Sequence, residues 1–104
     1  MIVHALVEGP SEQVFLEPWA RRLLKGHELV AYPHQGKGCL RHGPRDSRQR
    51  GLLDQLPAKL AAFGKSLNRD QERLLVLIDA DDEDVDALGQ RLEALRETLD
   101  PAPW

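Results

Sequence analysis

Residues 72–84, ERLLVLIDADDED, join an apolar run to a dense block of carboxylates. Leu74–Ile78 is short and entirely apolar, which is typical of a buried β-strand. Asp79 follows it directly, and acids dominate the next few positions. Like charges held close together cost stability unless water or a cation offsets the repulsion. The segment therefore predicts a strand that ends either at a solvated acidic turn or at a cation site.

The residues after the acidic block predict an amphipathic helix. Apolar side chains recur at steps of three and four residues from Val85 to Leu99, and Pro101 ends the pattern. Asp82 or Asp84 is a suitable N-cap, and acids in the first turn complement the positive end of the helix dipole. A strand that leads directly into a helix is the repeating unit of a parallel α/β sheet.

Two further strand–helix units are predicted upstream. Strands are predicted at Ile2–Val7 and at residues 27–32, which have the apolar character of strands. A helix is predicted at residues 52–67, where apolar side chains recur with helical periodicity. Another helix is expected from Ser11, its candidate N-cap, and Pro18 should kink or split it. We expect Trp19 to belong to the core. The apolar face of this helix is formed by Val14, Phe15, Trp19, Leu23 and Leu24.

The order strand, helix, strand, loop, helix, strand, helix predicts an α/β fold: a three-layer, Rossmann-like parallel sheet with helices on both faces. A chain of 104 residues fits a single domain, 1–104. Ligands of such sheets bind at the carboxyl ends of the strands. If the first and third strands are neighbours, Glu8 and Asp79 face each other at that edge.

Composition narrows the protein class. Cys39 is the single cysteine, so no intrachain disulfide forms. The first residues do not resemble a signal peptide, and no apolar run reaches the roughly 20 residues that a membrane-spanning helix needs. A cytoplasmic protein without a membrane partner is expected. His4 is expected to be a hydrogen-bonded core residue, and His34 and His42 surface residues without metal-ligand spacing.

Charge is distributed unevenly. Residues 33–50 carry five Lys/Arg and one Asp, a balance of +4, whereas 79–100 carry nine acids and two Arg, a balance of −7. A basic loop beside an acidic sheet edge suits a polyanion held near a metal, although solvated surface is the alternative. The candidate nucleic-acid contacts are Lys37, Arg41, Arg45 and Arg48.

Carboxylates from two strand ends would form a site for a hard cation. Mg²⁺ prefers oxygen ligands and keeps several waters, so two or three carboxylates suffice. Asp79 and Asp81 have a spacing that lets both reach one ion from an extended turn.

Residues 6–16, LVEGPSEQVFL, together with 77–82, LIDADD, resemble the Toprim (topoisomerase–primase) superfamily. The likeness is greatest to the nuclease-type OLD-family members and to small stand-alone bacterial Toprim-like proteins of unassigned function. It covers most of residues 1–99. Toprim domains usually carry a fourth parallel strand, and this pattern contains three, which is consistent with a fragment of a longer chain. The open sheet edge would then favour a homo-oligomer.

The resemblance implies a metal-dependent phosphoryl-transfer enzyme, most simply a nuclease that cleaves DNA or RNA. It implies that Glu8 is the general acid/base and that Asp79 and Asp81 bind Mg²⁺ or Mn²⁺. Glu12 matches a second acid of the nuclease-type pattern and is a further candidate ligand. Gly9 would let the backbone approach a phosphate.

Two other functions remain open from the sequence. A non-catalytic nucleic-acid-binding module would keep the fold and use the basic loop. A response-regulator receiver also gathers acids at this edge, but its acidic pair should follow the first strand, where this chain has Glu8 before Gly9-Pro10.

Overall fold

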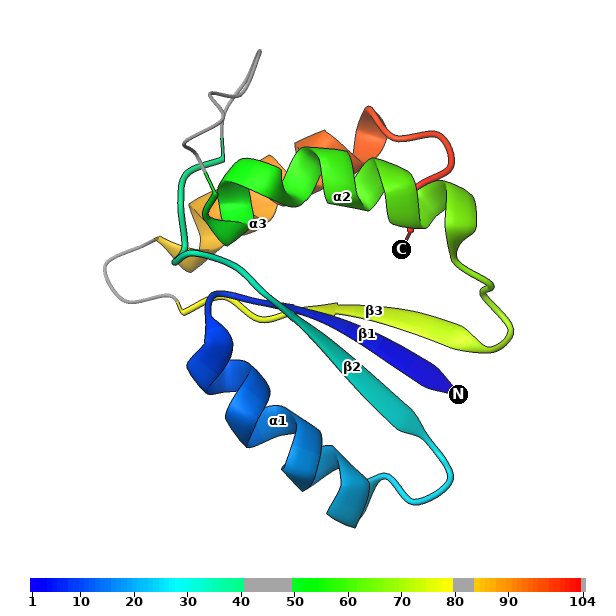
Figure 1. The fold of residues 1–104 in the computed structure, drawn as a ribbon. Helices are drawn as coiled ribbons and strands as arrows, with labels where there is room; N and C mark the ends of the chain where they lie inside the picture. The colour runs from blue at the N-terminus through cyan, green and yellow to red at the C-terminus, as the bar shows by residue number, and fades with distance from the viewer. Residues whose placement is uncertain (41–49, 80–83, 104) are drawn as a thin grey trace.

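The computed structural model describes residues 1–40, 50–79 and 84–103. The elements are β1 (Ile2–Val7), α1 (Pro10–Leu23), β2 (Glu28–Pro33), α2 (Leu52–Ser66), β3 (Glu72–Val76) and α3 (Val85–Glu97). The strands form a parallel sheet in the order β2-β1-β3. One face carries α1, and the other carries α2 and α3 (Figure 1). The predicted α/β class with a parallel sheet is confirmed, and the first and third strands are neighbours, the condition under which Glu8 and Asp79 were expected to face each other.

The central strand β1 is buried on both faces because its side chains are apolar on both. Leu6 points toward α2 and α3, where it packs with four buried leucines of α2 and with Leu88 of α3. Ala5 and Val7 point toward α1 and pack with Ala31 of β2. This double burial fixes the end of β1, and with it the position of the residue that follows, Glu8.

The predicted core role of Trp19 in α1 is wrong. Trp19 is 45% exposed, and most of the apolar face to which it belongs points to solvent. The helix instead packs through Leu16 and the buried Ala20, while polar side chains bind the backbone of β2. Gln13 Nε2 donates to the Ala31 carbonyl at 3.5 Å, and Glu17 Oε1 accepts the Ala31 N–H at 3.3 Å.

The residues at the N-termini of α1 and α3 determine where each helix begins. The N-cap of α1 is Gly9 and not the predicted Ser11, because Pro10 already occupies the first turn, where its missing N–H costs nothing. The helix continues through Pro18 as one element. For α3 the predicted cap Asp84 is confirmed, since its Oδ1 accepts the N–H groups of Asp86 and Ala87 at 3.0 and 3.2 Å.

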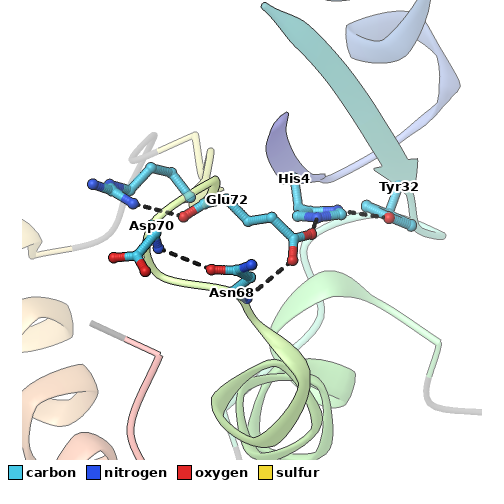
Figure 2. Close-up of polar contacts among 6 residues, drawn as sticks. His4, Tyr32, Asn68, Asp70 and Glu72 are labelled. Carbon is cyan, nitrogen blue, oxygen red and sulfur yellow. Dashed lines mark hydrogen bonds and ion pairs between the residues drawn. The ribbon is translucent and has the colours of Figure 1, made fainter. Parts of the chain in front are cut away.

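His4 is a hydrogen-bonded core residue, as predicted (Figure 2). Its Nε2 donates to the Glu72 carboxylate at 2.5 Å, and its Nδ1 lies 2.8 Å from the Tyr32 hydroxyl. The Asn68 backbone N–H and then His4 hold the pKa of Glu72 below its ordinary value. Side chains of β1, β2 and β3 are therefore linked across the sheet through His4. No helix in the described ranges is long and apolar enough to cross a membrane.

Candidate functional site

The carboxyl ends of β1 and β3 meet at one edge of the sheet. Leu77 donates its N–H to the Leu6 carbonyl at 3.0 Å, which continues the ladder one residue beyond β3. Two residues later, Asp79 donates its N–H to Glu8 Oε1 at 2.8 Å. The topology predicted that Glu8 and Asp79 would lie together, and the structure brings them together. Glu8 is half-buried and Asp79 is exposed.

The segment after β2 joins the same edge. Gly36 donates its N–H to the Glu8 carbonyl at 2.9 Å. The next residue, Lys37, donates from Nζ to the Asp79 carbonyl at 2.6 Å. A cationic side chain thus links the segment after β2 to the segment after β3. Residues from all three strand ends therefore surround one point at the edge of the sheet.

The first turn of α2 fixes the position of Lys37. The N–H groups of Leu52 and Leu53 are donated to the carbonyls of Gly36 and Lys37 at 2.9 and 2.7 Å. Such N–H groups at a helix start have no partner within the helix, so the loop satisfies them. The backbone of Lys37 is consequently anchored to the start of α2, while its side chain contacts Asp79.

Two glycines, Gly38 and Gly51, allow the loop after β2 to come close to the start of α2. Gly38 has φ of +68°, and a Cβ there would lie 3.0 Å from the Gly51 Cα and overlap the Asp54 carboxylate. Asp54 accepts the N–H groups of Cys39 and Gly51 at 3.2 and 3.0 Å. Sequence reasoning missed Asp54, and its position three residues after Gly51, in the first turn of a helix, was the available signal.

His34 lies beneath the site and is buried, with 6% exposure, so the predicted surface position is wrong. Its Nδ1 donates to the carbonyl of Val7, the residue before Glu8, at 2.7 Å. Its Nε2 accepts from Lys59 Nζ at 2.7 Å. The pKa of His34 lies below its ordinary value, chiefly because the ring is buried. The hydrogen bond to the Val7 carbonyl raises this pKa, whereas the charge of Lys59 lowers it. Burial also lowers the pKa of Lys59.

Glu12 lies one helical turn beyond Glu8, at the start of α1. Its Oε2 accepts the Ser11 hydroxyl at 3.1 Å and would lie 3.5 Å from a Cβ placed on Gly9. The carboxylate is therefore folded over the backbone of Gly9, next to Glu8.

Several predicted site residues lie outside the described ranges: Asp81, Arg41, Arg45 and Arg48. Among the residues that are described, no group of three or more His, Cys, Asp or Glu side chains is arranged to hold a metal ion. The acidic residues that the structure does bring to the edge are Glu8, through its carboxylate, and Asp79, through its backbone. Their oxygen donors have the chemistry that Mg²⁺ prefers, and Mg²⁺ is often held by one or two carboxylates and water.

The edge thus combines the half-buried Glu8 carboxylate, which accepts a backbone N–H, the exposed residue Asp79, and the Lys37 ammonium, which contacts the Asp79 carbonyl. Sequence comparisons add nothing to this geometry, because no protein-family model, curated protein or solved structure matches the chain.

Proposed function

We propose that the carboxyl edge of the sheet binds Mg²⁺ or Mn²⁺ through Asp79, next to Glu8, and that the domain cleaves phosphodiester bonds of nucleic acid. The observation that carries the proposal is the 2.8 Å hydrogen bond from the Asp79 N–H to Glu8 Oε1. It holds two acidic residues from distant parts of the chain at one solvent-accessible edge. Two negative side chains at one edge repel each other when they are close, and a cation between them would offset that repulsion.

Glu8 is the residue to which we assign proton transfer. Its Oε1 is oriented by the Asp79 N–H, and its Oε2 is then the oxygen that would take a proton from an attacking water or return one to the leaving oxygen. A bound divalent cation would neutralise the negative charge that develops on the phosphate. Asp79, with Asp81 as the resemblance to Toprim nucleases implies, would hold that cation.

Lys37 lies in the same basic loop as Arg41, and its Nζ contacts the Asp79 carbonyl. We assign to it the orientation of a phosphate near the acidic edge, together with Arg41, Arg45 and Arg48. The lysine ammonium is a compact charge at the end of a flexible side chain, so it can contact a phosphate without any preference for base sequence.

The test is a cleavage assay on single- and double-stranded DNA and RNA with Mg²⁺, Mn²⁺ or EDTA. Wild type should cleave at least one substrate with metal and none with EDTA, and Glu8→Gln should lose at least about a hundredfold in rate, the contribution typical of a general acid/base. Asp84→Asn, an acid of the α3 cap, is the matched control and should retain activity.

Binding without cleavage, equal in wild type and Glu8→Gln, would contradict the nuclease assignment and favour the non-catalytic binding module. Equal cleavage by wild type and Glu8→Gln would indicate a contaminating nuclease and also contradict the assignment.

A further inference from the structure

β3 is an edge strand within the described residues, since the sheet order places β1 on one side of it and no described strand on the other. Its backbone polar groups alternate between the two sides. The Gln71 carbonyl and the Leu77 N–H bond to β1, which assigns the odd-numbered residues to the inner side. The residues that direct their N–H and C=O groups to the outer edge are therefore Leu74, Val76 and Ile78.

The odd-numbered side chains of β3 and its extension form a continuous exposed row: Arg73, Leu75, Leu77 and Asp79. They lie on the face of the sheet that carries α1, but α1 packs over β2 and β1 and does not reach them. Leu75 and Leu77 are each 39% exposed. This row, which we call the β3 row, is apolar in its middle and oppositely charged at its two ends.

The β3 row is complementary to itself. If two copies of the strand lie antiparallel and are centred on Val76, Arg73 of each copy stands opposite Asp79 of the other, and Leu75 stands opposite Leu77. The outward N–H and C=O groups then form the ladder, and the β3 row occupies the non-hydrogen-bonded positions, where cross-strand side chains approach most closely. Shifting the centre by one residue, to Leu75, places Arg73 opposite Leu77 and removes the charge match.

We propose that β3 pairs with β3 of a second copy of this chain, antiparallel and centred on Val76, so that one sheet continues across both copies. The interface would be isologous, as in most symmetric dimers. On the opposite face of β3 lies a groove of about 360 Å³, which is lined by apolar side chains of α2, α3 and β3 with Glu93 at its rim. The even-numbered side chains of the second copy would extend this apolar surface.

The pairing also changes the candidate site. In the single chain, the exposed Arg73 side chain donates to the carbonyls of Arg69 and Glu72. In the dimer it would turn to the carboxylate of Asp79 in the second copy, so each copy would bring a guanidinium to the acidic edge of the other. The inference rests on β3 alone and does not depend on the proposed function.

Sedimentation equilibrium of the 104-residue chain in EDTA tests the pairing. Wild type should be a dimer, and Arg73→Asp or Asp79→Arg should each weaken self-association by about tenfold or more, because two attractive pairs become repulsive. Mixing the two variants should restore a dimer, since each then offers the charge that the other lacks. Circular dichroism of each variant verifies that it is folded.

Two matched lysine substitutions test whether the dimer interface lies on β3 or on α1. Leu75→Lys should abolish the dimer, because charge on an edge strand blocks its pairing. Phe15→Lys, at an exposed apolar position on α1, should leave the dimer intact. A monomeric wild type, a mixture of Arg73→Asp and Asp79→Arg that stays monomeric, or a dimer broken by Phe15→Lys and not by Leu75→Lys would each overturn the proposal.

Discussion

Glu8 Oε1 accepts the backbone N–H of Asp79 at 2.8 Å, which joins two residues that are 71 positions apart in the sequence. The bond follows the last ladder contact between β1 and β3 and closes that end of the sheet. Glu8 consequently has a structural role, as the acceptor that holds the backbone of Asp79 in the segment after β3, and a proposed chemical role, as a carboxylate at the candidate site. Substitutions at Glu8 should separate these roles.

Glu8→Gln should keep most of the stability, because the amide oxygen can still accept the Asp79 N–H. Glu8→Ala removes the acceptor and should lower the free energy of unfolding by about 1 kcal/mol. Both should lose metal-dependent stabilisation. Urea unfolding in EDTA and in Mg²⁺ measures both effects, and equal losses of stability for Gln and Ala in EDTA would contradict the structural role of the hydrogen bond.

The contact between the buried His34 and the half-buried Lys59 predicts a pH dependence of stability. The folded protein lowers the pKa of His34 below its ordinary 6.5, so folding favours the neutral imidazole. The stability that this provides is fully present above pH 6.5 and is lost as the pH falls from there toward the folded-state pKa. Protonation would place an Nε2–H against the Lys59 ammonium, where a lone pair now accepts a hydrogen bond.

We therefore expect the melting temperature of wild type to fall between pH 7.5 and pH 5.5, and that of His34→Gln to fall less over the same range. His27, which is exposed, provides the control: His27→Gln should retain the wild-type slope. If His34→Gln and wild type have parallel profiles, His34 is not the group responsible.

Two glycines in helices should respond oppositely to alanine. A Cβ on Gly89 of α3 would meet nothing within 4 Å, so Gly89→Ala should stabilise the protein by about 0.5–1 kcal/mol through helix propensity. A Cβ on Gly64 of α2 would collide with the Pro101 carbonyl of the segment after α3. Gly64→Ala should cost about 1–3 kcal/mol or displace that segment. Urea unfolding of both variants decides, and a stabilised Gly64→Ala would show that α2 and this segment do not pack as described.

Much of the fold could be predicted from hydrophobic periodicity. The leucine pattern of α2 and the run into β3 predicted buried elements close to those observed, because both bury their apolar faces in one core. Periodicity did not predict which face of α1 meets the sheet. There, Gln13 and Glu17 bind the backbone of β2 and turn Trp19 outward. Hydrogen bonds to the backbone of another element leave no periodic signal.

For the candidate site, parallel topology predicted that Glu8 and Asp79 would lie at the same edge, and the order of the strands, which the sequence left open, brings them together. It could not predict that Lys37 contacts the Asp79 backbone, since that depends on how the first turn of α2 holds Gly36 and Lys37. Burial of His34 was missed for a related reason. Its partners, the Val7 carbonyl and Lys59, come from other elements, and its neighbours in the sequence resemble a solvated loop.

Calorimetric titration of Mg²⁺ and Mn²⁺ into wild type, Asp79→Asn and Asp84→Asn is the most direct test of the proposed cation site. Asp84 is the matched control because its carboxylate caps α3 and asparagine caps helices equally well. We predict that wild type and Asp84→Asn bind at roughly millimolar metal and gain thermal stability by mass action, whereas Asp79→Asn does neither. Absence of binding to wild type, or loss of binding in Asp84→Asn and not in Asp79→Asn, would contradict the cation site.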